Sequence, residues 1–293
     1  FTVNEYERLL RCQDEPVLSS AMLANYKVMS LISRHKTRVV LEGQGADEYL
    51  GGYHGMEHSY HADLLRTFRW SRLSSELRAH AHQSDATVAS LLATAARRTI
   101  PRMVRRALGR PRPFRPAYLR PALAEALTLN GGPAPVRSRF RTEMLSHLTY
   151  AYLPFYLRYG DRNAMAFGIE TRLPFLDYRL VEYTLALPDE FKISRAVRKW
   201  LIREALASRL PEAIRSRTDK IGFQTPQGQW MRGPLRAKIT EMFAGDEYRS
   251  AAYVDSGHVL GMWERFLDGD ATLEQKVFRL FIFELWLRVF DLS

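Results

Sequence analysis

The stretch TRVVLEGQGADEYLGGY, from Thr37 to Tyr53, constrains the fold more than any other part of the chain. It begins as a short apolar, β-branched run, which is typical of a buried strand. Gly43 and Gly45 interrupt the run, and the pattern is helical again from Ala46 onward. A buried strand that ends in glycines and turns into a helix lets backbone approach a ligand and offers unpaired N–H groups. The stretch therefore makes the end of this strand a candidate anion site.

The two acids after the glycines, Asp47 and Glu48, have two explanations. Carboxylates in the first turn of a helix are favoured by the helix dipole alone. Asp47 would alternatively hold a Mg²⁺ ion that bridges phosphates, because Mg²⁺ prefers one or two carboxylates together with phosphate oxygens. The spacing matches neither GxGxxG nor GxxxxGK[ST]. The residues alone leave both explanations open.

The composition of the 293 residues excludes several classes of protein. A hydrophobic fraction of 46% and an aromatic fraction of 12% indicate a globular chain of one large domain or two small ones. No run of about 18 apolar residues and no secretory signal is found, so no membrane contact is expected. Cys12 is the single cysteine, which excludes an internal disulfide and favours a cytoplasmic protein. The start at Phe1, without Met, indicates a fragment or a processed product.

The formal charge of +11 is compatible with an anionic partner such as nucleic acid. We favour the alternative of solvated helix faces rich in arginine, because prolines interrupt the Arg-rich stretches. The Pro/Arg-rich residues 109–121 are expected to form a linker or surface excursion. The rest of the chain has mostly helical periodicity, and the RVVL run is the strand that the pattern predicts.

Two later stretches place polar residues beside turns. RNAMAFGIETRLPFLDYRLVEYTLALP contains Glu170 and Arg172, a carboxylate and a guanidinium that can orient a polar substrate. RTDKIGFQTP contains Lys220, whose ammonium can face a developing negative charge. The alternatives are a surface ion pair worth less than about 1 kcal/mol and a solvated lysine. The residues alone do not decide between them.

Histidines gather in YHGMEHSYH, where His54, His58 and His61 have a spacing that helical structure could turn into a set of metal ligands. The stretch also simply continues the helix that follows GGY, and we favour this second interpretation.

Three stretches in a fixed order carry a family resemblance. VVLEGQGADEYLGGY, AMAFGIETRLPFLDYRLVEYTLALP and RKWLIREALASRLPEAIRSRTDKIGFQTP together resemble the synthetase domain of the glutamine-hydrolysing asparagine synthetase family, which includes the β-lactam synthetases and lasso-peptide cyclases. The resemblance covers nearly the whole chain. It implies one partial synthetase domain over residues 1–293. The implied fold is α/β, of the Rossmann-like adenine nucleotide α-hydrolase (PP-loop ATPase) type, with a large helical part.

The resemblance also implies a carbon–nitrogen ligase. ATP adenylates a carboxylate, pyrophosphate leaves, and an amine attacks the acyl-adenylate. In asparagine synthetase the acid is aspartate and the amine is ammonia from a glutaminase (glutamine amidotransferase) domain, and the products are asparagine, AMP and pyrophosphate. The implied cofactors are ATP and Mg²⁺, and a homodimer is left open. Two alternatives remain: an amide ligase of the same fold that tailors a natural product or a surface polysaccharide, and a non-catalytic basic module that binds nucleic acid or a partner.

The site roles that the resemblance implies fall on residues of all three motifs. The nucleotide is assigned to Glu42, Gly43 and Gly45, the magnesium with its pyrophosphate to Asp47, and the support of this metal site to Glu48. Lys220, in a K-x-G-F pattern, would stabilise charge on the adenylate. Glu170 and Arg172 match an E-x-R stretch near the acceptor, as catalytic and substrate-binding residues. Asp177 is expected to anchor the turn after PFL.

The chain departs from the family pattern at the loop itself. The family sequence S-G-E-G-[AS]-D-E is replaced by EGQGADE, so Glu42 stands for a serine and Gln44 for the glutamate linked to formation of the intermediate. Gln44 can donate and accept hydrogen bonds but cannot take a proton, which leaves the identity of the acid open. Neither the SGG-x-DS pyrophosphate loop nor the glutaminase domain is found in the chain. We therefore expect a domain truncated at its N-terminus and inactive on its own.

Overall fold

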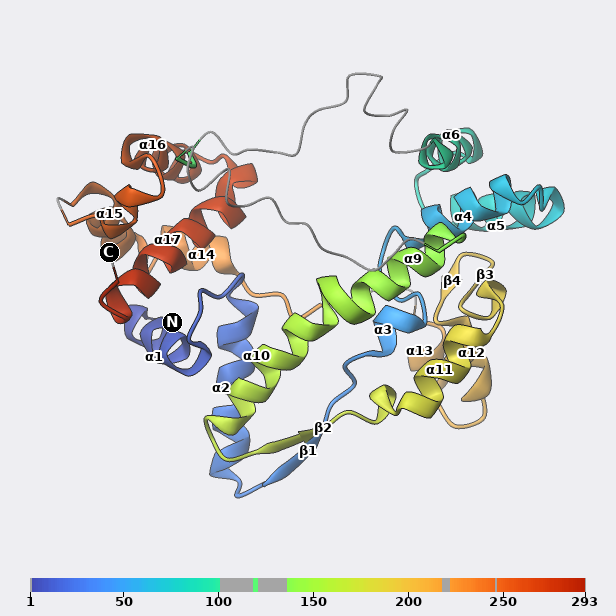
Figure 1. Ribbon diagram of the computed structural model, residues 1–293, viewed down its shortest axis with the longest axis horizontal. Coiled ribbons are helices and arrows are strands. Elements are labelled where there is room, and N and C mark those ends of the chain that lie inside the picture. Colours follow the sequence, from blue (N-terminus) through green and yellow to red (C-terminus); the bar gives the residue numbers. More distant parts are fainter. Residues whose placement is uncertain (1, 101–117, 121–135, 218–221, 246, 293) are drawn as a thin grey trace.

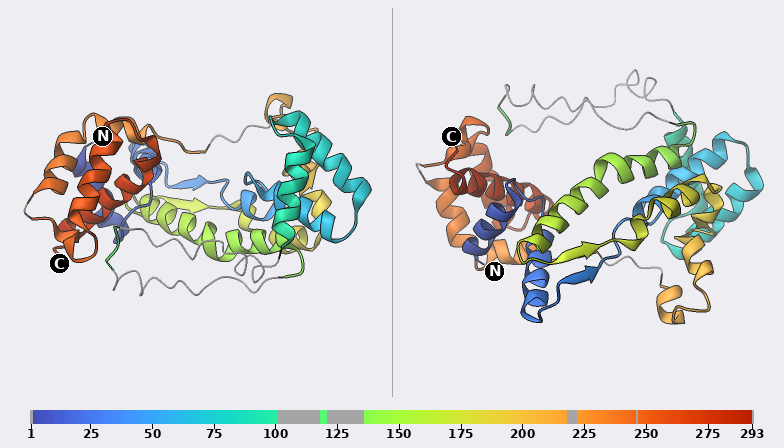
Figure 2. Two further views of the ribbon diagram at one scale, coloured as in Figure 1. Left: turned by 90° about the horizontal axis from the view of Figure 1, so that it is seen from above. Right: turned by 60° about the horizontal axis from the view of Figure 1, so that its bottom comes forward.

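The computed structural model of the protein describes residues 2–100, 118–120, 136–217, 222–245 and 247–292. Two groups of helices lie at opposite ends of the molecule, and a long helical column and a short parallel sheet run between them (Figure 1). The views in Figure 2 show the same separation from two further directions. This architecture of mostly helices with a few strands is compatible with the expected α/β class. None of the described helices combines the length and the apolar character that crossing a bilayer requires.

The first group joins the N-terminal helices to the C-terminal ones. It contains α1 (Val3–Gln13), α2 (Ala21–Arg34), α14 (Gln227–Arg232), α15 (Arg236–Ala244), α16 (Ser256–Leu267) and α17 (Glu274–Val289). Its core includes the fully buried Tyr6, Trp263, Phe278 and Phe281. Helix α17 is surrounded by the other helices, and this explains why its sequence is apolar on almost all sides.

The second group contains α3 (Ala46–Tyr49), α4 (Met56–Arg66), α5 (Trp70–Gln83), α6 (Val88–Thr99), α9 (Arg139–Ser146), α11 (Tyr178–Ala186), α12 (Trp200–Ala205) and α13 (Glu212–Arg215). A short antiparallel hairpin, β3 (Ile193–Ser194) and β4 (Val197–Arg198), lies among them. The largest core cluster of this group is built around Tyr60, Leu73, Phe140 and Met144. Short 3₁₀ turns connect elements throughout the chain at η2 (Pro174–Leu176), η3 (Asp189–Phe191), η4 (Arg249–Ala252) and η5 (Ala271–Leu273).

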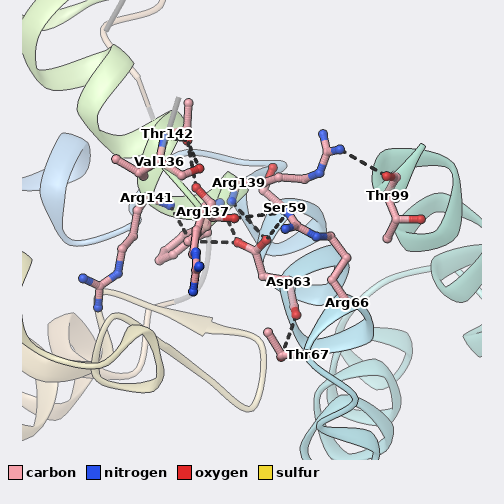
Figure 3. A network of polar contacts seen from close by, with 12 residues as sticks. Ser59, Asp63, Arg66, Thr67, Thr99, Val136, Arg137, Arg139, Arg141 and Thr142 are labelled. Atoms are coloured by element: carbon pink, nitrogen blue, oxygen red, sulfur yellow. Dashed lines mark hydrogen bonds and ion pairs between the residues drawn. The ribbon is translucent and has the colours of Figure 1, made fainter. Parts of the chain in front are cut away.

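The column between the groups is formed by α9, the π-helical turn η1 (His147–Ala151) and α10 (Leu153–Met165) (Figure 1). Its start is fixed by Asp63 of α4, which is 8% exposed. The Asp63 carboxylate accepts hydrogen bonds from the backbone N–H groups of Arg139 at 3.0 Å and Phe140 at 2.9 Å, and from the Ser138 hydroxyl at 2.8 Å (Figure 3). Because the first N–H groups of a helix have no partner inside it, this carboxylate caps α9 from a neighbouring helix.

The sheet consists of β1 (Val39–Leu41) and β2 (Glu170–Arg172), which are parallel, with Val39 opposite Glu170 and Leu41 opposite Arg172. The expectation that the RVVL run is buried is wrong: Val39 is 42% exposed and Leu41 is 73% exposed. Val40 packs against the cluster of Met29 from α2, Ala164 from the end of α10 and Ile169, which directly precedes β2. Successive side chains of a strand point to opposite faces, and within the described residues one face of β1 is packed while the other is open.

The predicted excursion over residues 109–121 falls largely outside the described residues. Within it, Tyr118, Leu119 and Arg120 are described, and Leu119 forms an isolated antiparallel bridge with Val254 at the C-terminal group.

Candidate functional site

The loop after β1 needs glycine at Gly45, which begins α3 with φ of +100°. A Cβ at this position would lie 2.2 Å from Cδ2 of Leu176 in η2, so both the backbone conformation and the contact exclude other residues. The Tyr49 hydroxyl donates to the carbonyl of Phe175 at 2.8 Å, and the Glu42 N–H donates to the carbonyl of Arg172 at 2.9 Å. The first two motifs of the sequence are therefore packed together.

Asp47 forms an ion pair with Lys199, whose Nζ lies 2.6 Å from the carboxylate Oδ1. The Asp47 and Lys199 side chains are 25% and 33% exposed, whereas Oδ1, the oxygen that Lys199 contacts, is buried. Gly52 makes room for it, because a Cβ there would lie 1.9 Å from Oδ1 of Asp47 and 2.6 Å from Cε of Lys199. Lys199 begins α12 from a left-handed backbone conformation. It was not singled out from the sequence, although it stands in the third motif, RKWLIREAL, directly before an apolar run.

Glu48 is 1% exposed and accepts a hydrogen bond from the Tyr53 hydroxyl at 2.5 Å. Burial and, after it, the contact with Glu48 raise the pKa of Tyr53, so the phenol keeps its proton. This arrangement holds Glu48 in place behind Asp47. It fits a supporting role better than that of a metal ligand, because the carboxylate is enclosed and already bound to a hydroxyl.

An aromatic wall stands next to the two acids. The Tyr53 ring lies 5.1 Å from the rings of both His147 and Tyr152, and Tyr156 is stacked on Tyr152 at 6.2 Å. Burial raises the pKa of Tyr156, with Tyr152 and then Glu48 and Asp47 as further causes. His147 lies in η1, Tyr156 in α10 and Tyr152 between the two, whereas Tyr53 precedes α4. Turns of π-helix such as η1 are frequent at functional sites. Sequence reasoning missed it, because helical periodicity gives no sign of a π turn.

The remaining predicted nucleotide residues differ in their surroundings. Glu42 is half-buried, and burial raises the pKa of its carboxyl group. Gln44 is half-buried as well. Gly43 is exposed, and a Cβ there would have no described atom within 4 Å. In contrast to Gly45, this glycine is not required by packing within the described residues.

Glu170 and Arg172 pair with each other on β2, with 2.8 Å between Oε1 and Nε, and their side chains are 59% and 61% exposed. The contact with Glu170 raises the pKa of Arg172. Asp177 anchors its turn as the sequence predicted, because its carboxylate accepts the N–H of Arg179 at 2.9 Å and caps α11. Lys220 lies outside the described residues.

The residues present fit a magnesium–phosphate group at Asp47. Asp47 is a partly exposed carboxylate at the end of a glycine-rich loop, and Mg²⁺ is bound in proteins through one or two carboxylates together with phosphate oxygens. Glu48 would hold the loop behind it.

Comparison with known proteins decides the family. Residues 2–288 match the family model described as Asparagine synthase. The chain belongs to the asparagine synthase family. It is 25% identical over 300 residues to the glutamine-hydrolyzing asparagine synthetase 1 of Bacillus subtilis (strain 168), a match that covers 97% of this chain and 45% of the relative.

Two further relatives show the breadth of the asparagine synthase match. The putative glutamine-hydrolyzing asparagine synthetase of Mycobacterium tuberculosis (strain ATCC 25618 / H37Rv) is 27% identical over 292 residues, which cover 94% of this chain and 43% of the relative. The amidase chyE of Penicillium rubens is 32% identical over 115 residues, 36% of this chain and 17% of that protein. The chain thus spans less than half the length of the asparagine synthetases that it matches over most of its own length.

Proposed function

We propose that the protein containing this chain is an ATP-dependent amide-forming ligase of the PP-loop ATPase fold, which adenylates aspartate for attack by ammonia. The observation that carries the proposal is the convergence of three separate motifs at Asp47. The loop ending in Gly45 supplies the carboxylate, η2 packs beneath the loop, and Lys199 approaches the carboxylate to 2.6 Å. The names of the B. subtilis and M. tuberculosis relatives support the choice of reaction.

In this proposal the loop residues bind different parts of the nucleotide and its metal. Glu42, Gly43 and Gly45 contact the nucleotide, and Asp47 holds the magnesium, with Glu48 as its support. When bound, Mg²⁺ neutralises charge on the phosphates as pyrophosphate leaves. Lys199 orients the Asp47 carboxylate and places a second cation beside the same developing charge. We assign Lys220 to the adenylate, and the exposed pair of Glu170 and Arg172 to the acceptor side.

Gln44 sets the specificity in this proposal. It lies in the turn between the strand end and Asp47, and it has the length of a glutamate without the charge. A ligase of the same fold that acts on another carboxylic acid is the second candidate, and the neutral amide at this position is the observation that favours it.

The test is AMP release by the natural protein that contains this chain, with ATP, aspartate and ammonium, in the wild type and in Gln44→Glu. We expect AMP release to depend on aspartate, and to increase in Gln44→Glu because the carboxylate restores the charge that the family carries at this step. Aspartate-dependent release near zero in both proteins, with activity on a different acid, would favour the second candidate. Release of AMP with no acid at all would contradict both.

A further inference from the structure

Helices α4 and α5 bring together three imidazole rings that are not part of the loop of Asp47. His58 and His61 lie one turn apart on α4, and His80 faces them from α5. One ring nitrogen from each histidine lies within 4.8 Å of the other two. The ring centroids are 5.4 Å apart for His58 and His80, 5.5 Å for His61 and His80, and 6.3 Å for His58 and His61.

Four ring nitrogens of this cluster are buried without a hydrogen-bond partner among the described residues. His61 is 0% exposed, and neither its Nδ1 nor its Nε2 has a partner. The Nδ1 atoms of His58 and His80 are likewise buried without one. A buried polar group left in this way costs roughly 1–3 kcal/mol, and a helix contact that needed only packing would be served better by leucine or phenylalanine. The cluster therefore has the buried nitrogen atoms of a ligand-binding site and not the apolar atoms of a packed core.

The histidines also have the charge state that metal ligation requires. Burial, followed by the neighbouring His80 and His58, lowers the pKa of His61 to about 3, so the ring is neutral at pH 7. Burial lowers the pKa of His58 and of His80 as well. Neutral imidazole is the form that binds a metal ion.

We propose that His58, His61 and His80 bind one divalent transition-metal ion, Zn²⁺, with water as the fourth ligand, and that this ion clamps α4 to α5. Zn²⁺ binds imidazole nitrogens at about 2.0–2.1 Å in tetrahedral geometry, which places the centroids of three bound rings roughly 5 Å apart. The observed separations of 5.4, 5.5 and 6.3 Å approach this arrangement, and small side-chain rotations complete it. Imidazole ligands also suit Zn²⁺ chemically, in contrast to the oxygen ligands of Mg²⁺.

The surroundings determine the fourth ligand. Glu57, Glu76 and Glu143 face the histidines, as do Arg98 and Arg198. The three carboxylates are engaged elsewhere: Glu57 accepts from Arg198 at 3.0 Å, Glu76 from the N–H of Ala196 at 2.9 Å, and Glu143 from the Ser59 hydroxyl. The three carboxylates balance the charges of the two arginines and do not bind the metal ion. A cavity of about 310 Å³, which His80 lines together with His54 and Glu57, gives water and the ion a route to the site.

His54 is not part of the site. Its Nδ1 contacts Arg198, and the third ligand is His80, which the sequence places 19 residues after His61. Helical spacing within YHGMEHSYH identifies two of the three ligands, because the third comes from a different helix.

The test uses the full chain, freed of metal with a chelator, and Zn²⁺ as the only added ligand. We expect one equivalent to bind and to raise the melting temperature. His80→Asn should weaken binding by at least 100-fold, since even outer-shell changes cost about 10–100-fold. His82→Asn is the matched control, because His82 is exposed on the same helix and outside the cluster. Equal affinities in the two variants, or binding well below one equivalent, would overturn the site.

A second readout needs no variant. Co²⁺ added to the metal-free wild-type chain should give the intense visible absorption of a tetrahedral ion, and one equivalent of Zn²⁺ should abolish it. Absorption typical of octahedral Co²⁺, as in water, would overturn the proposal even if His80→Asn failed to fold.

Discussion

At the scale of single residues, the candidate site depends on two glycines whose lack of a side chain leaves room for residues of other segments. Gly45 and Gly52 leave space that Leu176 and the pair of Asp47 and Lys199 fill. Because the loop backbone touches two other segments at these points, small changes there should alter both the stability of the chain and the position of Asp47.

Gly45→Ala tests this packing. The left-handed conformation costs roughly 1–2 kcal/mol for a residue with a Cβ, and overlap with Leu176 adds about 1–3 kcal/mol. We therefore expect urea unfolding to show a loss of about 2–5 kcal/mol. The matched control is Gly43→Ala, where a Cβ meets no described atom and φ is not positive, and which should change stability very little. Equal effects of the two substitutions would contradict the assigned packing.

Lys192 gives a pH dependence. It is 0% exposed, its Nζ donates to the Leu187 carbonyl at 2.7 Å, and burial lowers its pKa from 10.5 to about 8. Between these values the unfolded chain keeps a proton that the folded chain has released, so the free energy of unfolding rises with pH. Relative to Lys192→Met, the wild type should gain about 1.2 kcal/mol per pH unit between about pH 8.5 and 9.5. Denaturant unfolding of both proteins measures this, and a constant difference would refute it.

At the scale of elements, the column from α9 to α10 positions the aromatic wall, and its start depends on a residue from another helix. Asp63 reaches from α4 to the first N–H groups of α9. The sequence shows the helical period of both helices, but it does not reveal this cap, because donor and acceptor are 76 residues apart. The π-helical turn η1 was unpredictable for a related reason, since a single wide turn leaves the apolar pattern of its neighbours unchanged.

Asp63→Ala should lower the free energy of unfolding by about 2–3 kcal/mol, because two backbone N–H groups and the Ser138 hydroxyl lose a charged acceptor. Asp177→Ala provides the comparison, as an exposed cap of α11 whose loss should lower the free energy of unfolding by less. Thermal or urea unfolding of the two variants decides, and a smaller loss for Asp63→Ala than for Asp177→Ala would contradict the account.

At the scale of the whole molecule, the motifs predicted the family, whereas the surroundings of the sheet and the contact between the loop and η2 were not predictable. The RVVL run has the apolar character of a buried strand, yet Leu41 is 73% exposed, because the described residues cover one face of β1 only. The approach of Lys199 to Asp47 also depends on packing across 152 residues of sequence, which a local pattern does not contain.

The open face of the sheet leads to a prediction for the 293-residue chain on its own. With Leu41 exposed at the end of β1, the nucleotide would be contacted from one side only, so we expect weak binding of Mg-ATP and no turnover. Calorimetry with Mg-ATP provides the measurement. Binding in the micromolar range by these residues alone would show that the described site is sufficient.

The central claim is that Asp47 holds the metal at which ATP activates a carboxylic acid. The most direct measurement is acid-dependent ATP–pyrophosphate exchange by the natural protein that contains this chain, in the wild type, Asp47→Asn and the exposed control Asp177→Asn. The account predicts exchange in the wild type and in Asp177→Asn, and a loss of at least about 100-fold in Asp47→Asn, because the amide removes the negative charge that faces Mg²⁺. Full exchange in Asp47→Asn would contradict it.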